Sequence, residues 1–419
     1  MKVLTINTSD SIGGAAIAAY RLHRGLVESG IEAQMLSLRK AKDDPTVVDF
    51  DHPLVKILNR FKLLNKPERL ISRYYLGKRP VAFSASFFSA PGILKKIREI
   101  NPDVVHIHWT HGGFLDPVTI AKIAKPIVWS LHDMWVFTGG CQYNEGCKKY
   151  ETGCGACPVL NSDNLQDISR TVFERKQKAY ARMPNFTIVG LSRWLAQCAR
   201  DSLIFNHSNP RIVNLPNGID TSVYKPTDKQ QAKEKLNLPQ DKKIVLFGAM
   251  QATSDKRKGF HLLSESIKHL EKYFDKSEIE LLVFGTGSPP YDSIFSFPVS
   301  SVGRMSDDAS LALLYNAADV TLVPSMEENL SNIILESMSC GTPVIAFNIG
   351  GNPDLIDHNI NGYLAKPYST QEFADGIRHV LQADHLNSLS PEARKKVECK
   401  FDLRMVAKQY IELYNKILD

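Results

Sequence analysis

The chain has 419 residues, too many for one hydrophobic core and about right for two domains of ordinary size. Hydrophobic residues make up 43% and charged residues 23%, which is typical of a globular chain and excludes wholesale disorder. The net charge of +6 suits a ligand or surface that carries phosphates but is far from that of a polybasic protein, so we expect no nucleic-acid partner.

The N-terminal residues Met1–Asn7 form a predicted strand and not a secretion signal. They contain one lysine and a short apolar run, without the long apolar region and small-residue cleavage site of a signal peptide. No stretch of the sequence reaches the roughly 18 apolar residues that a membrane-spanning helix needs. We therefore expect a cytoplasmic protein.

Short apolar runs alternate with helical stretches through the first half of the chain. The runs that we predict to be buried strands are Val3–Ile6, Ala33–Leu38, Val104–Ile107, Ile127–Leu131 and Phe186–Leu191. Between the first two lies a predicted helix, Ala15–Ser29. Strands that alternate with helices in this way predict a parallel sheet with helices on both faces.

A linker separates this half from a second set of strands. Leu215–Asp220 contains a proline and an Asn-Gly pair, which punctuate turns. The second set of predicted strands is Ile244–Gly248, Ile279–Phe284, Val299–Val302, Val320–Val323 and Pro343–Ala346, and a predicted helix, Phe401–Leu418, follows them.

The prediction is an α/β protein of two Rossmann-like, doubly wound domains, residues 1–220 and 221–400. A C-terminal helix at residues 401–419 is expected to pack back on the first domain. We expect a ligand to bind between the domains, outside the carboxyl ends of the strands.

Three loops that follow predicted strands carry candidate ligand-binding residues. The first contains Gly13 and Gly14, which let the backbone approach a ligand at the N-terminus of a helix. The alternative is a tight strand-to-helix turn that binds nothing.

The second loop contains Glu328, and Glu336 follows on a predicted helix whose N-cap is Ser331 or Asn332. Two carboxylates so placed could accept hydrogen bonds from hydroxyls at two ends of one ligand, with helix amides between them facing a phosphate. The alternative is a solvated acidic loop beside a wet helix face.

The third loop, Asp255–Gly259, contains the cations Lys256, Arg257 and Lys258. Near a ligand they could neutralise a departing diphosphate. A run of charge is also typical of a solvated turn.

Several motifs occur in one order along nearly the whole chain. They are Asn7–Gly14, Pro216–Asp220, Lys258-Gly259, Phe284–Gly287, Tyr315–Val320, the pair Glu328 and Glu336, and Cys340–Val344. This series resembles the family-four retaining glycosyltransferases, whose GT-B fold consists of two Rossmann-like domains facing across a cleft. The subgroup that the chain resembles most builds bacterial extracellular or capsular polysaccharides of the colanic-acid kind.

The resemblance implies a role for each matching residue. Glu336 would hold the ribose of a sugar nucleotide, and Glu328 would contact hydroxyls of the transferred sugar. Lys258 would stabilise the leaving phosphates, and Gly13-Gly14 would approach the same region from the first domain. The amides that would meet the sugar and the diphosphate are those of Asn329, Leu330, Ser331 and Asn332.

One departure from the family concerns a phosphate-binding cation. Where the family usually has an arginine after a strand glycine, the chain reads Gly248-Ala249-Met250. Arg257 or Lys256 would have to supply that second charge.

Histidines follow two of the predicted strands. The resemblance places His132 near the sugar, where it could orient a hydroxyl, and a histidine satisfied within its own loop is the alternative. His106, His108 and His111 cluster around Trp109 and could line an acceptor pocket. Without a nearby set of carboxylates they do not indicate a metal site.

The resemblance implies transfer of one sugar from a nucleotide-sugar donor to a saccharide or lipid-linked saccharide acceptor, with retention at the anomeric carbon. No cofactor is required for transfer if Lys258 and its neighbours supply the positive charge. The alternatives are a sugar-nucleotide epimerase, a glycogen-synthase-like transferase and a catalytically silent nucleotide-sugar-binding protein of the same fold.

A glycine-rich insertion, residues 139–160, carries four cysteines within seventeen residues: Cys141, Cys147, Cys154 and Cys157. Four thiolates suit a tetrahedral zinc ion or an iron–sulfur cluster. The last two have the Cys-x-x-Cys spacing of zinc sites, whereas the first pair is more widely spaced. We interpret the cluster as a structural zinc site, with free thiols or two disulfides as the alternatives. A reducing compartment argues against the disulfides.

Residues 53–79 combine eight basic side chains with a single acidic one, Glu68, and with an apolar set at helical spacing. A basic amphipathic helix could lie on the inner face of an anionic membrane, where lipid-linked acceptors reside. A pair of surface helices that pack on the domain fits the same pattern.

Overall fold

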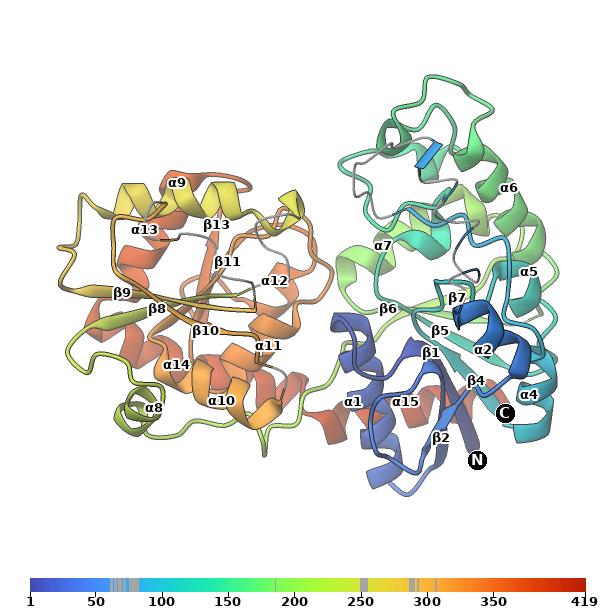
Figure 1. Cartoon of the computed structure of the whole chain (residues 1–419), viewed down its shortest axis with the longest axis horizontal. Coiled ribbons are helices and arrows are strands. Elements are labelled where there is room, and N and C mark those ends of the chain that lie inside the picture. The colour runs from blue at the N-terminus through green and yellow to red at the C-terminus, as the bar shows by residue number, and fades with distance from the viewer. Residues whose placement is uncertain are drawn as a thin grey trace. The chain divides into compact units, whose positions relative to one another are not determined.

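The computed structural model describes residues 1–60, 63, 66, 70, 73–74, 83–184, 186–248, 255–285, 291, 294–305 and 307–419. The chain forms two compact units: Met1–Asn217 together with Val406–Asp419, and Gly218–Met405. Each unit contains a parallel sheet with helices packed against it (Figure 1). The predicted α/β class with two Rossmann-like sheets is therefore confirmed.

Within the described ranges, the first unit has a sheet of seven parallel strands in the order β3-β2-β1-β4-β5-β6-β7. The strands are β1 (Lys2–Ser9), β2 (Glu32–Arg39), β3 (Val47–Asp49), β4 (Val104–Ile107), β5 (Ile127–Leu131), β6 (Thr187–Gly190) and β7 (Arg211–Asn214). The helices are α1 (Gly14–Glu28), α2 (Pro53–Arg60), α4 (Ile93–Ile100), α5 (Pro117–Ile120), α6 (Ile168–Tyr180), α7 (Arg193–Asp201) and α15 (Leu403–Leu418). Every residue of β4 and β5 is buried, as parallel strands covered on both faces require.

Helix α15 packs on the first unit, although it follows the second unit in the sequence. Tyr410 and Tyr414 belong to one buried cluster with Val3 and Leu26. The Tyr414 hydroxyl lies 2.7 Å from Nδ1 of His106 on β4. In Figure 1 the red helix α15 accordingly lies with the blue elements α1 and β1.

The second unit has six parallel strands among its described residues, in the order β10-β9-β8-β11-β12-β13. The strands are β8 (Lys243–Gly248), β9 (Ile279–Phe284), β10 (Val299–Gly303), β11 (Val320–Val323), β12 (Val344–Phe347) and β13 (Gly362–Ala365). The helices are α8 (Lys229–Lys235), α9 (Phe260–Leu270), α10 (Asp308–Ala317), α11 (Asn332–Ser339), α12 (Asn352–Leu355), α13 (Thr370–Val380) and α14 (Ala383–Lys400).

Two segments of chain connect the units, and they are hydrogen-bonded to each other. The amide of Ile219 donates to the carbonyl of Phe401, and the amide of Leu403 donates to the carbonyl of Ile219, both at 2.9 Å. The sequence-based boundaries at residues 220 and 401 fall in or beside these two segments.

The strand order reverses once in each sheet. In the first sheet β1 lies between β2 and β4, and in the second β8 lies between β9 and β11. In doubly wound sheets, ligands bind at the carboxyl ends of the strands where the order reverses. The loops after β1 and β4, and those after β8 and β11, therefore stand at the expected ligand-binding positions.

Among the described helices, none is both long enough and apolar enough to cross a lipid bilayer.

Candidate functional site

The loops after β8 and β11 bring together a cation and a carboxylate that the sequence had singled out. Lys258 ends the 3-10 helix η5 (Lys256–Lys258), and its Nζ lies 3.1 Å from Oε2 of Glu328. The two side chains are only 25% and 12% exposed, so their charges are felt more strongly than they would be in open water. The residues are 70 positions apart, and the pairing of β8 with β11 is what makes them neighbours.

The backbone of η5 is held against the end of β11. Gly259 has a φ of +69°, and a Cβ added there would lie 1.9 Å from the carbonyl oxygen of Pro324, so only glycine fits. Asp255 caps η5 by accepting a hydrogen bond from the amide of Arg257, and its Oδ2 lies 2.7 Å from Nη2 of the same arginine. The amide of Met326 donates to the carbonyl of Arg257 at 2.7 Å. These contacts fix the basic loop beside the acidic one.

Two glycines that the sequence analysis did not single out hold the backbone of Glu328. Gly350 has a φ of +51°, and a Cβ there would lie 2.0 Å from the Glu328 carbonyl oxygen. The amide of Gly351 donates to that oxygen at 3.1 Å. The available signal was a pair of consecutive glycines shortly after a strand, which marks close approach of backbone.

Glu336 lies on α11 and is only 4% exposed, which excludes the solvated helix face that was its alternative. The hydroxyl of Tyr315, on α10, donates to Glu336 Oε2 at 2.9 Å. Burial, and then the neighbouring carboxylate, raise the pKa of Tyr315, so this hydroxyl keeps its proton. The tyrosine therefore holds one oxygen of the carboxylate in position.

The segment between the two glutamates is buried and leads into a helix N-terminus. Asn329, Leu330 and Ser331 are 3%, 7% and 6% exposed, and Ser331 is the N-cap of α11, which begins at Asn332. First-turn amides have no partner within their own helix, and the helix dipole adds a partial positive charge. This end of α11 is therefore suited to a phosphate.

In the first unit, the loop after β1 ends at Gly13, and α1 begins at Gly14. Gly13 has a φ of +90°, and no described atom lies within 4 Å of the position that a Cβ would take. Asn7 ties this loop to the one after β4, because its Oδ1 accepts a hydrogen bond from the amide of Trp109 at 2.8 Å. The backbone at Gly13 therefore borders open space, where a ligand could approach it closely.

His132 directly follows β5 and is partly exposed. Its Nε2 lies 2.9 Å from Nδ1 of His108, which accounts for one ring nitrogen. Burial lowers the pKa of His132 to about 4, so the ring is neutral near pH 7. A neutral imidazole can still orient a hydroxyl. The contact with His108 therefore fits both interpretations of His132, as a residue that orients the sugar and as a histidine satisfied within the protein.

For His106 and His111 the structure corrects the expectation of an acceptor-pocket lining. His106 is fully buried against Tyr414 of α15, and burial lowers its pKa to about 3. His111 is buried between the rings of Trp109 and Trp135, at centroid distances of 4.5 and 4.4 Å. Both pack in the interior of the first unit: His106 lies on β4, which is buried along its whole length, and His111 lies in the loop that follows it.

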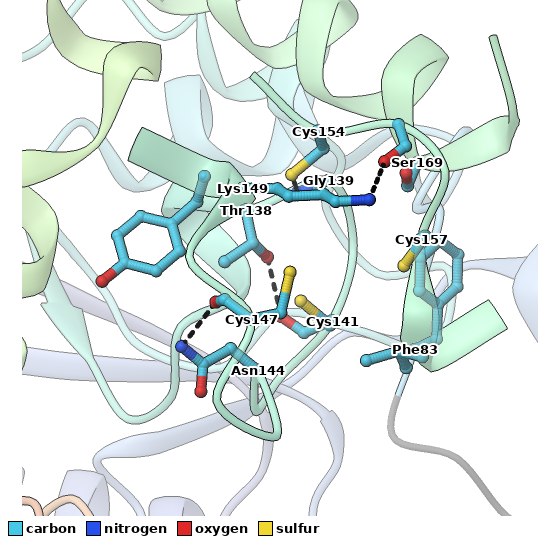
Figure 2. A pocket seen from close by; sticks show the side chains of 13 residues that line it. Phe83, Thr138, Gly139, Cys141, Asn144, Cys147, Lys149, Cys154, Cys157 and Ser169 are labelled. Atoms are coloured by element: carbon cyan, nitrogen blue, oxygen red, sulfur yellow. Dashed lines mark hydrogen bonds between the residues drawn. The ribbon is translucent and has the colours of Figure 1, made fainter. Parts of the chain in front are cut away.

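The four clustered cysteines line a single cavity in the insertion (Figure 2). All seven cysteines of the chain are described and none forms a disulfide. In the described part of the chain, no three His, Cys, Asp or Glu side chains lie close enough together to hold a metal ion as they stand.

Two predictions concern residues outside the described ranges. The first is the departure at Ala249 and Met250, where the family usually has an arginine; both residues lie outside the described ranges. The second is the basic segment 53–79, much of which also lies outside them. The described part of that segment includes helix α2, on which Leu54 and Ile57 are 54% and 52% exposed.

Comparison with known proteins identifies two matching family models. The model described as Glycosyltransferase Family 4 matches residues 12–223, and the model described as Glycosyl transferases group 1 matches residues 241–383. The chain is 26% identical to a D-inositol 3-phosphate glycosyltransferase of Thermobispora bispora, over 97% of this chain and 90% of the relative. It is 24% identical to the protein of the same name from Corynebacterium aurimucosum, over 97% of this chain and 91% of the relative.

Solved structures share the fold. HepE from Anabaena, solved with UDP and glucose, matches with a TM-score of 0.64 at 16% identity, over 99% of this chain and all of that chain. Sucrose-phosphate synthase from Thermosynechococcus elongatus matches with a TM-score of 0.67 at 20% identity, over 99% of this chain and 98% of that chain.

Proposed function

The chain belongs to glycosyltransferase family 4, and on this basis we propose that it moves a sugar from a nucleotide-sugar donor to a saccharide or lipid-linked saccharide acceptor, with retention at the anomeric carbon. The observation that carries the proposal is the 3.1 Å pair between Lys258 and Glu328 at the point where the strand order of the second sheet reverses. A nucleotide sugar carries an anionic diphosphate, which a cation can bind, and sugar hydroxyls, which can donate hydrogen bonds to a carboxylate. Lys258 and Glu328 supply one such cation and one such carboxylate at this place.

Donor binding would exchange the partners of this ion pair. The diphosphate would take the ammonium of Lys258, and sugar hydroxyls would donate to the carboxylate of Glu328. The ribose hydroxyls would donate to Glu336, whose other partner, Tyr315, is already in place. The N-terminus of α11 lies between the two carboxylates in the sequence and would meet the phosphates.

In the transfer step, the acceptor hydroxyl attacks the anomeric carbon from the face on which the diphosphate departs. A new C–O bond forms to the acceptor as the C–O bond to the diphosphate breaks, and the acceptor proton passes to an oxygen of the leaving diphosphate. The protein contributes positioning, and Lys258 stabilises the charge that develops on the leaving group. His132, a neutral imidazole, would orient a hydroxyl by a hydrogen bond.

The acceptor is proposed to belong to bacterial surface polysaccharide synthesis, on the motifs that resemble that subgroup. The names of the curated relatives favour a second candidate, a phosphorylated inositol. The two acceptor classes are separated by supplying each in turn with the preferred donor and following transfer of labelled sugar.

A lipid-linked acceptor would place the enzyme against the inner face of the membrane, and the described part of segment 53–79 supports such a contact. Helix α2 exposes Leu54 and Ile57 on either side of the charged Lys56. Apolar and basic side chains together are what an anionic lipid surface attracts.

The proposal is tested by replacing the two residues with different roles. Lys258→Ala should lower kcat about 10²- to 10³-fold, as loss of a charge-stabilising group does, with a smaller effect on KM. Glu336→Ala should raise the donor KM about tenfold or more, because the ribose loses its acceptor. Lys272→Ala, which removes an exposed lysine of the same unit, is the matched control.

The readout is nucleoside diphosphate release, measured with and without acceptor. The donor is first chosen from a panel of nucleotide sugars by the rise in melting temperature that binding causes. Wild-type turnover in the Lys258 and Glu336 variants would contradict the assignment. Products formed without any acceptor would favour the epimerase, and tight donor binding with no turnover would favour a silent binding protein.

A further inference from the structure

The insertion between β5 and α6 encloses a small cavity lined by four thiols. Cys141, Cys147, Cys154 and Cys157 all line it, and Figure 2 shows their side chains arranged around the hollow. Its volume is about 20 Å³, which is enough for one water molecule or one ion.

Tight turns bring these thiols to one place. The amide of Cys147 donates to the carbonyl of Asn144, and the Asn144 side chain donates back to the carbonyl of Cys147, both at 2.8 Å. Between Cys154 and Cys157 the backbone is left-handed, with φ of +137° at Gly155 and +44° at Ala156. A Cβ on Gly155 would lie 2.3 Å from the carbonyl oxygen of Leu165, so the loop closes only with glycine there.

A backbone amide points at one of the sulfurs. The amide of Gly139 donates to Cys154 Sγ at 3.2 Å. Such an N–H···S bond acts to stabilise a thiolate, which is the form that binds a metal. The backbone of Gly139 also packs closely against Cys154, since a Cβ on Gly139 would lie 2.8 Å from the Cβ of Cys154.

We propose that these four cysteines bind one zinc ion in this cavity. Four soft thiolates around a single-ion space suit tetrahedral Zn²⁺, with Zn–S distances of about 2.3 Å. The described side chains do not yet converge closely enough to hold an ion, so binding requires the thiols to rotate toward the centre of the hollow. Each thiol that binds gives up its proton, and the ion replaces four protons.

The zinc would anchor the insertion to the loop after β5. The amide of Met134 donates to the carbonyl of Gln142 at 2.9 Å, and the amide of Ser84 donates to the carbonyl of Gly140 at 2.8 Å. Ser84 in turn accepts a hydrogen bond from Nε1 of Trp135 at 2.7 Å. The site is therefore structural, and it neither depends on the proposed transfer reaction nor takes part in it.

The test measures metal content of the full chain, purified with a reducing agent and without chelators. Mass spectrometry of metals should find about one zinc per chain. Cys154→Ser and Cys157→Ser should each lose most of it, whereas Cys399→Ser, which alters an exposed cysteine outside the cluster, should keep it. Where a serine variant fails to fold, the wild-type chain is stripped with a chelator and titrated with Co²⁺ alone, whose thiolate charge-transfer bands report sulfur ligation.

Each alternative gives a distinct result. Iron with labile sulfide would overturn the proposal in favour of a cluster. In the chain purified without a reducing agent, a native mass lower by four hydrogens, restored by reduction, would overturn it in favour of two disulfides. A metal-free reduced chain with no cobalt–thiolate bands would show four simple thiols.

Discussion

Mild acid should unfold the first unit before the second, because four histidines are buried there in the neutral form: His23, His106, His108 and His111. His23 and His106 are 0% exposed and His111 is 5% exposed. Burial lowers the pKa of His23 to about 4 and those of His106 and His111 to about 3. In the unfolded chain each ring titrates near its ordinary pKa of about 6.5.

The sign of the effect follows from this order of pKa values. Well above about pH 6.5 the rings are neutral in both states and the free energy of unfolding does not depend on them. As the pH falls through about 6.5, the unfolded chain binds protons that the folded unit excludes, so stability is lost. By about pH 5 the loss is about 2 kcal/mol for each histidine, or about 6 kcal/mol for His23, His106 and His111 together.

That loss is comparable to the whole free energy of unfolding of an ordinary domain, about 5–15 kcal/mol.

The carboxylate of Asp44, in the same unit, does not change stability in the pH range where the histidines act. Burial acts to raise the pKa of Asp44, but hydrogen bonds from Thr46 lower it to about 2. Its stabilising contribution is therefore lost only below about pH 4.

Tryptophan fluorescence isolates the first unit, because all four tryptophans lie in it: Trp109, Trp129, Trp135 and Trp194. Far-ultraviolet circular dichroism follows both units. Urea unfolding at about pH 7.5 and at about pH 5 should show a much earlier fluorescence transition in acid, while part of the circular dichroism signal survives to higher urea.

A single variant tests the reasoning. In His23→Gln the amide can keep the 2.8 Å contact that Nε2 makes with Thr46 Oγ1, but it does not titrate. The difference in free energy of unfolding between the two pH values should shrink by about 2 kcal/mol. His207→Gln, at an exposed position in the same unit, should leave that difference unchanged. If the His23 variant lost as much stability in acid as the wild type, burial of neutral histidine would not be the cause.

Two further substitutions probe the donor site of the second unit. Gly259→Ala should displace the basic loop, because its Cβ would overlap the carbonyl oxygen of Pro324, and donor affinity should fall at least about tenfold. Gly303→Ala has nearly the same φ, +66°, with nothing described within 4 Å, so it carries the backbone strain without the clash. Tyr315→Phe removes the hydrogen bond to the buried Glu336, and the donor KM should rise several-fold, in line with about 1–3 kcal/mol.

Donor affinity is measured by calorimetry and KM by nucleoside diphosphate release. If donor affinity fell equally in Gly259→Ala and Gly303→Ala, backbone strain, and not displacement of the basic loop, would control donor binding. Tyr273→Phe, on the exposed surface of the same unit, is the control for the tyrosine change, and an unchanged KM in Tyr315→Phe would mean that Glu336 does not need this partner.

The sequence alone determined the fold class and most strands, because buried parallel strands appear as apolar runs. It missed β3, β7 and β13 for a physical reason. β3 has three residues, β7 is largely exposed, and β13 is short and begins with glycine, so none presents an apolar run. The candidate residues in the loops after β1, β5, β8 and β11 were also visible, since each of these loops follows a predicted strand.

Which of those residues are neighbours was decided only by the tertiary structure. Lys258 meets Glu328 because β8 pairs with β11, and His106 meets Tyr414 across 308 positions because α15 packs on the first sheet. The placement of Glu336 in the core, beside Tyr315, likewise depends on how α10 packs against α11. A local pattern reports how deeply a segment is buried, but strand order and helix packing decide what each side chain touches.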